Sequence, residues 1–317
     1  MKKIIQGAAV LFFGLIFSAS AFAAPREVIP GGNAVGLQFH TQGVSIVELT
    51  DAVPKEAGLK KGDMIVQVDD TAISTTADLK KCIENSSGKT LTVHILRENK
   101  QKEYVLAPKM SPNGWQLGLL VKDSICGIGT VTYYDSSNGS FGALGHGVGT
   151  QNALLPLREG EVLPAAIHSV IRGQEGKPGA LQGEPLSRES CGQILRNTPQ
   201  GIFGIGMADR GTPIPVASAG EIRTGEAMIL SNVTGTQVEE FTVQIREIRP
   251  GDNKDRNFVL EVTDPRLLNT TGGIVQGMSG SPIIQDGKLI GAVTHVLVDD
   301  PTTGYGIFIE NMLDAAA

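Results

Sequence analysis

A serine near the C-terminal end of the chain has the local sequence of a nucleophile for acyl transfer. Ser279 occurs in the sequence GMSGSP, two residues after Gly277 and directly before Gly280. A tight turn of this kind can present the hydroxyl to a cleft while backbone N–H groups converge on a substrate carbonyl oxygen. Residues 283–293 read as an apolar run, an Asp-Gly turn and a second apolar run. This predicts a β-hairpin and not the helix that follows the serine of α/β-hydrolases. An ordinary turn between two buried strands is the alternative interpretation.

His146 has the sequence context that a general base for this serine needs. Of the five histidines, it is the one that stands between glycines, in the sequence FGALGHGVG. Glycines allow the backbone to bend sharply and leave an imidazole accessible from one side, as proton transfer requires. A structural histidine is the usual alternative, but the serine turn downstream favours catalysis. The other four lack such a turn: His40, His94, His168 and, in the strand expected after the serine hairpin, His295.

Spacing does not choose the carboxylate that would orient the histidine in a serine–histidine–acid triad. Asp264 comes at the end of an expected strand and before a proline, where aspartate more often forms a turn. Asp135 and Asp209 are competitors, and Asp299 and Asp300 lie in an expected loop.

The elements that would position these residues are short strands. Between residues 115 and 317, apolar runs alternate with Gly- and Pro-rich turns, and no long helix is indicated. Many short strands separated by turns are typical of a barrel or a sandwich. The expected strands cover residues 131–135, 165–171, 201–207, 227–232, 239–248 and 258–262.

The N-terminal part alternates strands with one helix and resembles a PDZ domain over residues 28–108. Residues 57–63 read AGLKKGD, and residues 77–84 form an expected helix with Leu79 and Ile83 on one face. The resemblance implies that an extended peptide adds as a strand beside a carboxylate-binding loop, with the helix as the other wall of the groove. A spacer that binds nothing is the alternative. The loop residues implied are Val35, Gly36, Leu37, Gln38 and Phe39.

Residues 115–317 resemble the SpoIVB peptidase family, the stage IV sporulation serine peptidases of endospore-forming bacteria. The stretches FGALGHG, TDP, GIVQGMSGSPII, GAVTHV and DPT carry the resemblance. It implies that His146 is the base, Asp264 the orienting acid and Ser279 the nucleophile. A wider likeness to trypsin-like proteases implies backbone oxyanion donors at Gly277 and Ser279. The implied fold is mainly β, a PDZ domain followed by a trypsin-like double β-barrel. Trypsin-like proteases take their acid from the first barrel, so the role of Asp264 depends on the narrower family.

The family resemblance also implies a function, that of an extracytoplasmic serine endopeptidase of sporulation signalling. The implied location is the space between the forespore and mother-cell membranes. The implied substrate is a membrane-bound regulator of an intramembrane protease, whose cleavage allows processing of pro-sigma-K, and self-cleavage near the N-terminus is implied as well. No metal or cofactor is expected, because acyl transfer to serine needs neither. The alternatives are a non-catalytic PDZ adaptor and a general extracytoplasmic quality-control protease, which would place its PDZ domain after the protease domain.

Residues 1–24 have the pattern of a secretory signal peptide. Two lysines, an apolar run and an Ala-Phe-Ala ending predict export, with an uncleaved N-terminal membrane anchor as the alternative. The net charge of −6 without a basic cluster disfavours nucleic acid as a partner. Three widely spaced cysteines form neither a disulfide framework nor a metal-ligand motif. We therefore expect protein or peptide partners.

Overall fold

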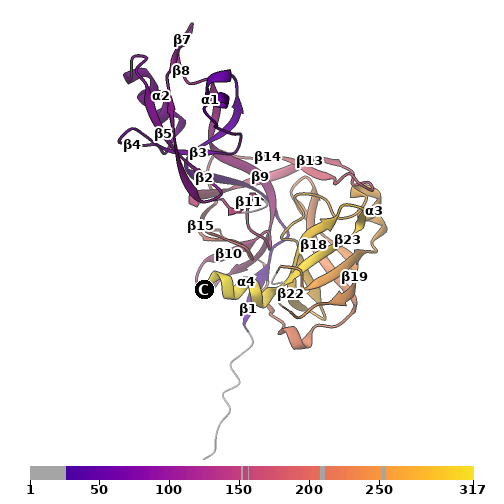
Figure 1. The fold of residues 1–317 in the computed structure, drawn as a ribbon. Coiled ribbons are helices and arrows are strands. Elements are labelled where there is room, and N and C mark those ends of the chain that lie inside the picture. Colours follow the sequence, from indigo (N-terminus) through magenta and orange to yellow (C-terminus); the bar gives the residue numbers. More distant parts are fainter. Residues whose placement is uncertain (1–25, 151–152, 156, 208–210, 252–254) are drawn as a thin grey trace, which may run out of the picture.

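The computed structural model describes residues 26–150, 153–155, 157–207, 211–251 and 255–317 (Figure 1). The predicted signal peptide and the competing acid Asp209 lie outside these residues. Within them, no helix is both long and apolar enough to cross a bilayer. Strands dominate the fold, and the chain forms two barrels and a smaller projecting unit.

Six antiparallel strands close a barrel in the C-terminal part of the chain, paired in the order β18-β19-β20-β23-β22-β21. Its interior is apolar, and Val243, Ile245 and Leu260 are fully buried there. The predicted hairpin after Ser279 joins β21 to β22, and its turn residue Asp286 has a φ of 50°. A left-handed turn of this kind matches the twist of the two strands. The barrel strands are β18 (Gly225–Thr234), β19 (Gln237–Ile248), β20 (Phe258–Val262), β21 (Pro282–Gln285), β22 (Lys288–Leu297) and β23 (Asp300–Phe308).

A second ring of six strands forms the N-terminal barrel. Each strand pairs with the next in the order β9-β10-β16-β15-β13-β2, and β2 closes the ring by pairing with β9. Leu37, Phe39 and Val162 are among the buried residues of its core. The two rings confirm the double β-barrel expected from the sequence. The strands are β2 (Ala34–Leu49), β9 (Leu119–Asp135), β10 (Ser140–Ala143), β13 (Leu157–Ile171), β15 (Gly192–Thr198) and β16 (Gly201–Ile205).

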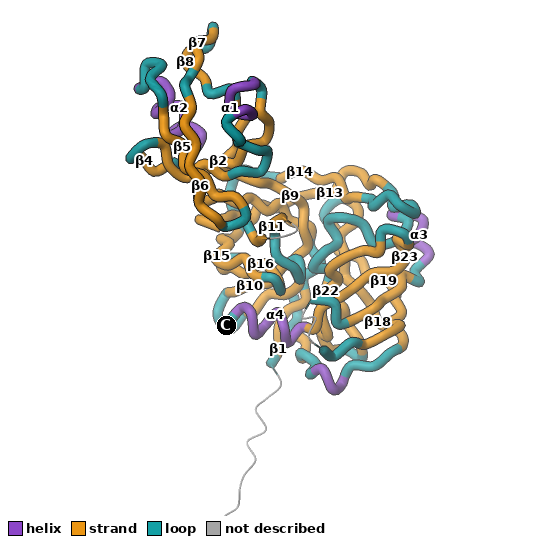
Figure 2. The backbone as a smooth tube through the Cα atoms, in the orientation of Figure 1, coloured by secondary structure: helices purple, strands orange, loops and turns teal. Residues whose placement is uncertain are grey.

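The C-terminal helix α4 (Ile309–Ala316) ties the two barrels together (Figure 2). Ile309, Met312 and Leu313 on one of its faces are buried in a cluster that also contains Tyr133 and Phe203 of the N-terminal barrel. Smaller elements complete the barrel region: β1 (Glu27–Pro30), β11 (Gly149–Thr150), β12 (Ala153–Leu154), β14 (Ala180–Pro185), β17 (Ile214–Pro215), η1 (Ala219–Glu221) and α3 (Pro265–Thr271).

The strands β2 and β9 continue beyond the N-terminal barrel and carry the PDZ-like unit. Val44 and Ser45 of β2 pair with β3 on one side, and residues 45–49 pair with residues 119–122 of β9 on the other. The PDZ-like unit therefore lies between the barrel-forming parts of β2 and β9, and the division into residues 28–108 and 115–317 stays a prediction. Its remaining elements are α1 (Ala52–Glu56), β3 (Met64–Val68), β4 (Thr71–Ala72), α2 (Thr76–Asn85), β5 (Leu91–Arg97), β6 (Lys100–Leu106), β7 (Lys109–Ser111) and β8 (Gly114–Gln116).

The helix α2 forms where the sequence predicts it. Thr75 is the N-cap and accepts a hydrogen bond from the Asp78 N–H at 3.1 Å, while the Asp78 carboxylate accepts one from the Thr75 N–H at 2.9 Å. This capping box satisfies two N–H groups that the helix itself cannot pair. Leu79 and Ile83 then pack into the core of the unit.

Candidate functional site

His146 follows β10 in a turn that brings it to the interface of the two barrels. Leu144 and Gly145 both have a φ of 68°, so the backbone reverses directly before the histidine. A Cβ on Gly145 would lie 2.9 Å from Cγ2 of Thr294, which shows how closely this turn approaches the other barrel. His146 Nδ1 lies 2.9 Å from the Gly147 carbonyl oxygen. Because a carbonyl can only accept, Nδ1 carries the proton, and Nε2 is left with the lone pair of a base.

Ser279 lies in a turn of the C-terminal barrel that is held by a strand of the N-terminal barrel. The Thr130 N–H donates to the Ser279 carbonyl at 3.1 Å, and Thr130 Oγ1 donates to the Gly277 carbonyl at 2.7 Å. Thr132 Oγ1 donates to the Gly280 carbonyl at 2.8 Å. Gly280 has a φ of 97°, and a Cβ there would lie 2.1 Å from the Thr130 carbonyl oxygen. Only glycine fits this position, because any side chain would clash with the backbone of β9.

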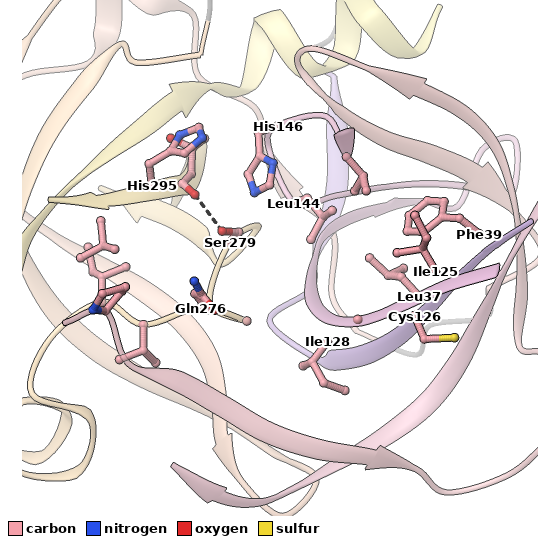
Figure 3. Close-up of a pocket in the computed structure, with 18 of the residues that line it drawn as sticks. Leu37, Phe39, Ile125, Cys126, Ile128, Leu144, His146, Gln276, Ser279 and His295 are labelled. Carbon is pink, nitrogen blue, oxygen red and sulfur yellow. Dashed lines mark hydrogen bonds between the residues drawn. The ribbon is translucent and has the colours of Figure 1, made fainter. Parts of the chain in front are cut away.

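His146 and Ser279 line one cavity of about 450 Å³ between the barrels (Figure 3). Apolar side chains form most of its wall, with Phe39 and Ile128 on the N-terminal barrel and Val275 on the other. Among the described residues, no aspartate, glutamate, lysine or arginine lines this cavity. An apolar, largely pre-formed cleft with a few polar groups is typical of a substrate site.

The Ser279 hydroxyl is held by a backbone carbonyl of the C-terminal barrel. Ser279 Oγ donates its hydrogen bond to the Thr294 carbonyl at 2.7 Å (Figure 3). Within the described part of the chain it makes no hydrogen bond with His146. A rotation about the Cα–Cβ bond would turn the hydroxyl away from Thr294. Such catalytic hydrogen bonds often tighten only when substrate is bound.

The backbone around Ser279 leaves two donors free. Within the described residues, the N–H groups of Gly277 and Ser279 have no hydrogen-bond acceptor, whereas the Met278 N–H donates to Val275 at 3.1 Å. Gly277 has a φ of 98°, a conformation that glycine adopts without strain. The two free donors are those that the sequence comparison with trypsin-like proteases implied for an oxyanion hole.

Burial and one carboxylate shape the electrostatics of the histidines at this site. Burial lowers the pKa of His146, while its contact with the Gly147 carbonyl and the charge of Asp255 oppose that shift. Burial and the neighbouring His146 lower the pKa of His295 to about 4, again with Asp255 acting in the other direction. The Asp255 backbone carbonyl also accepts a hydrogen bond from Thr294 Oγ1 at 3.1 Å. Sequence reasoning missed Asp255, because it lies in a polar turn without any distinguishing motif.

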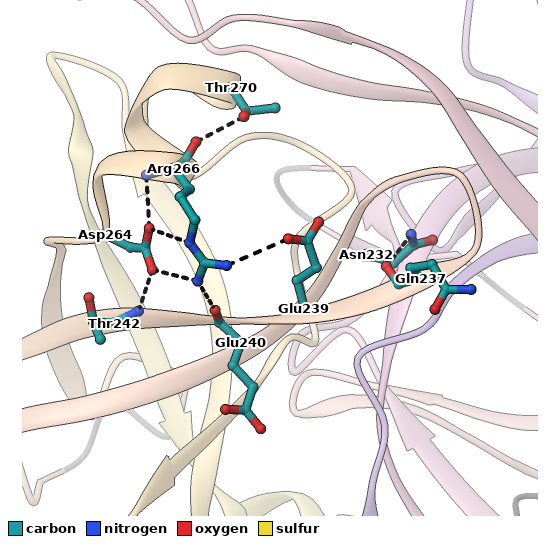
Figure 4. A network of polar contacts seen from close by, with 8 residues as sticks. All are labelled: Asn232, Gln237, Glu239, Glu240, Thr242, Asp264, Arg266 and Thr270. Carbon is teal, nitrogen blue, oxygen red and sulfur yellow. Dashed lines mark hydrogen bonds and ion pairs between the residues drawn. The ribbon is translucent and has the colours of Figure 1, made fainter.

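Asp264 does not meet the other two members of the implied triad. It is the N-cap of α3 and accepts from the Arg266 backbone N–H at 2.8 Å and from the Arg266 guanidinium at 2.9 Å (Figure 4). A further hydrogen bond comes from the Thr242 N–H at 3.3 Å. These contacts, first among them the Arg266 side chain, lower the pKa of the Asp264 carboxyl. Asp264 therefore serves as the cap of a helix that starts at Pro265. His146 and Ser279 line one cavity, and Asp264 is not among the residues that line it.

The other competing acids are also engaged elsewhere. Asp135 pairs with Arg26 at 3.0 Å and accepts from the Ser137 N–H at the end of β9. Asp300 accepts from the side chains of Thr302 and Thr303. These acids therefore form local turns and pairs.

Replacing Asp264 with alanine is expected to lower the stability of the protein and to leave the reactivity of Ser279 unchanged. The change removes an N-cap, which stabilises a helix by about 0.5–2 kcal/mol. It also removes the ion pair with Arg266, which keeps its contacts with Glu239 and Glu240. Thermal unfolding and the rate of fluorophosphonate labelling at Ser279 measure the two effects separately. Unchanged stability together with lost labelling would instead restore the role of orienting acid to Asp264.

The predicted carboxylate-binding loop of the PDZ-like unit does not lie at a free sheet edge. The predicted loop, Val35 to Phe39, is part of β2, and its residues pair with β13 on one edge and β9 on the other. An added peptide strand therefore has no free edge there, which corrects the prediction. The prediction failed because the barrel partners of β2 are distant in sequence.

A groove is present between α2 and the start of β9. Its volume is about 230 Å³, and it is lined by Leu79 and Ile83 of α2 together with Trp115 and Leu119. Residues 119–122 pair with β2 on one edge, and no described strand covers the other edge. The arrangement of a free strand edge beside a helix is that of peptide-binding domains that add a ligand strand.

Comparisons with known proteins match the N-terminal and C-terminal parts of the chain separately. Residues 34–107 match the PDZ domain family. A curated protein of Mesorhizobium japonicum, "Putative zinc metalloprotease mll0638", is 29% identical over 84 residues, which are 26% of this chain and 23% of that protein. The chain thus spans about a quarter of the length of this relative.

Solved structures show more distant similarity. The Rv3671c protease of M. tuberculosis in its active form aligns with 73% of this chain and 80% of its own, with 15% identity and a TM-score of 0.35. The PDZ domain of an SdrC-like protein from Listeria monocytogenes covers 25% of this chain and 87% of its own, with 20% identity and a TM-score of 0.24.

One match extends over the C-terminal barrel and over every strand of the N-terminal barrel except β2. Residues 113–313, which contain His146, Asp264 and Ser279, match the family described as SpoIVB peptidase S55. This match covers well over half of the chain. The chain therefore belongs to the SpoIVB peptidase S55 family.

Proposed function

We propose that this protein is a serine endopeptidase in which Ser279 is the nucleophile and His146 the base. The observation that carries the proposal is that the two side chains, from different barrels, line one cavity. As Ser279 Oγ bonds to the peptide carbonyl carbon, its proton passes to His146, and the carbonyl π electrons move onto the oxygen beside the free N–H groups of Gly277 and Ser279. Collapse of the tetrahedral intermediate breaks the C–N bond, and His146 returns the proton to the leaving amine. Water then hydrolyses the acyl-enzyme.

The cellular role that fits this chain best is a step in sporulation signalling outside the cytoplasm. Family membership and the sequence pattern of residues 1–24 support this proposal. The substrate would be a membrane-bound regulator of an intramembrane protease, cleaved in the space between the forespore and mother-cell membranes so that pro-sigma-K is processed. Cleavage of the chain's own N-terminal segment belongs to the same proposal.

Labelling with a fluorophosphonate tests the catalytic assignment without knowledge of the substrate. The protein comprising residues 25–317 would be treated with the probe, and the modified peptide identified by mass spectrometry. The proposal expects a tag on Ser279 that is absent in His146→Ala. Absence of the tag, with and without peptides that occupy the PDZ-like groove, would favour a non-catalytic adaptor.

We further propose that the groove between α2 and β9 captures an extended peptide segment of the substrate or of a regulator. Leu119→Asp places a charge beside apolar α2 side chains. It is expected to weaken peptide binding by at least about tenfold, which corresponds to a loss of about 1.4 kcal/mol in binding free energy. Trp115, the only tryptophan, lines the groove, so its fluorescence reports on binding directly. Labelling of Ser279 should remain unchanged in this variant. Equal peptide affinity in both proteins would remove the groove from the proposal.

A further inference from the structure

His295 is a half-buried histidine beside the proposed base, and the proposed reaction does not yet use it. It lies on β22, directly after the residue whose carbonyl accepts the Ser279 hydroxyl, and it lines the same cavity as His146. The ring centroids of His146 and His295 are 4.9 Å apart, with 33° between the ring planes. Figure 3 shows the two rings facing each other above Ser279.

One nitrogen of His295 is buried without a partner. Within the described residues, Nδ1 of His295 has no hydrogen bond and no contact with solvent. An unpaired buried N–H is rarer than an unpaired acceptor, so the proton of the neutral ring is best placed on Nε2 and the lone pair on Nδ1. An unsatisfied buried polar atom costs about 1–3 kcal/mol, and in a native structure it calls for an explanation. Nδ1 of His295 would be explained if its partner formed only during the reaction.

The site offers no carboxylate hydrogen bond to the base. The Nδ1–H of His146 is directed to the Gly147 carbonyl, and Asp264 is bound to Arg266. Asp255 acts on both histidines through its charge, without a hydrogen bond to either in the described part of the chain. The ring beside His146 is therefore the imidazole of His295. In a serine–histidine–acid triad, the group beside the histidine is a carboxylate.

We propose that His295 is the positioning residue of the catalytic base. Its neutral ring holds His146 in place, and its Nδ1 lone pair stabilises the imidazolium that His146 becomes on taking the Ser279 proton. This inference rests on the proposed peptidase function. A neutral acceptor is suited to the task because it does not have to be desolvated as an ion in this apolar cavity. The interaction strengthens as charge develops on His146, so it favours the transition state over the ground state.

Three variants separate a positioning role from a packing role. His295→Phe keeps a ring without nitrogens, and we expect it to slow fluorophosphonate labelling of Ser279 by about 100-fold, within the range of general-base effects. His295→Asn restores an acceptor oxygen and is expected to recover the rate to within about tenfold of wild type. His295→Leu matches asparagine in size without an acceptor and should resemble His295→Phe. If His295→Phe fails to fold, the asparagine and leucine pair gives the same comparison.

The pH dependence of labelling is the readout that packing alone would not move. Loss of the acceptor destabilises the His146 imidazolium, so the pKa of His146 falls further and the acid limb of the rate moves to lower pH in His295→Phe. The asparagine variant should keep the limb near its wild-type position. The charged and titratable groups around His295 are His146 from the β10 turn, Asp255 and Arg256 before β20, and Tyr305 on the paired strand β23. These four are unchanged in all three variants.

The outcomes distinguish this inference from the proposed function. No tag on Ser279 in the wild type contradicts the peptidase assignment itself. A tag that forms at the wild-type rate and pH in His295→Phe overturns the positioning role and leaves the peptidase standing. A normal labelling rate with a raised KM for peptides would instead make His295 part of the substrate wall. His168→Phe is the matched control, because His168 is an exposed histidine on β13.

Discussion

Ser279→Ala and His146→Ala are each expected to reduce peptide cleavage by at least about a thousandfold, as loss of a nucleophile or its base does in serine proteases. Both side chains line a cavity and neither fills a barrel core, so the unfolding temperature should stay close to that of wild type. Cleavage assays and thermal unfolding check the two statements. Residual cleavage near the wild-type rate in either variant would contradict the assignment.

The pH profile of the wild type gives a further check on the base. His146 must be neutral to accept the Ser279 proton, and burial lowers its pKa from the ordinary value of 6.5. Activity should therefore be retained at neutral pH and lost on acidification, with a midpoint below pH 6.5. In His168→Ala, which changes a histidine outside the cavity, the same profile is expected. A midpoint above 6.5 would show that another group titrates.

The architecture was predictable because its signals are local. Glycines around His146, the Ser279 turn with its hairpin, and the Thr75 cap of α2 are all encoded by neighbouring residues. The many short strands predicted a barrel or a sandwich, and the resemblance to known families narrowed this to the double barrel that the structure shows. The family match confirms that resemblance. The assignment of His146 and Ser279 as catalytic stays a prediction that labelling can test.

The predictions that failed concern strand pairings between residues that are distant in sequence. Residues 34–41 look like the entrance strand of a PDZ domain, but their partners β9 and β13 lie about 90 and 120 residues away, so local pattern could not reveal that both edges are used. The groove is instead completed by Leu119, which follows the last predicted element of the PDZ domain. Asp264 illustrates the same limit, because its helix-capping sequence is visible locally while its distance from His146 is not.

Thr130→Val is the change outside the reacting groups that should affect catalysis most. Thr130 is fully buried. Its hydroxyl donates to the Gly277 carbonyl, and its N–H donates to the Ser279 carbonyl. Valine keeps the shape but leaves the Gly277 carbonyl without its donor, at a cost of about 1–3 kcal/mol if the turn does not move. Relaxation of the turn shifts both the nucleophile and the proposed oxyanion donors. We expect kcat to fall by roughly 100-fold, as displacements near 1 Å can cause.

Thr41→Val provides the matched control for Thr130→Val. Thr41 is equally buried in the N-terminal barrel, and its hydroxyl is donated to the Gly43 carbonyl, away from Ser279. It should lose stability and keep kcat, whereas Thr130→Val should lose both. Peptide binding monitored by Trp115 should persist in Thr130→Val, because Thr130 lies on β9 well beyond the groove. If the two threonine variants lost kcat equally, general loosening of the barrel would explain the effect, and β9 would have no special hold on the nucleophile turn.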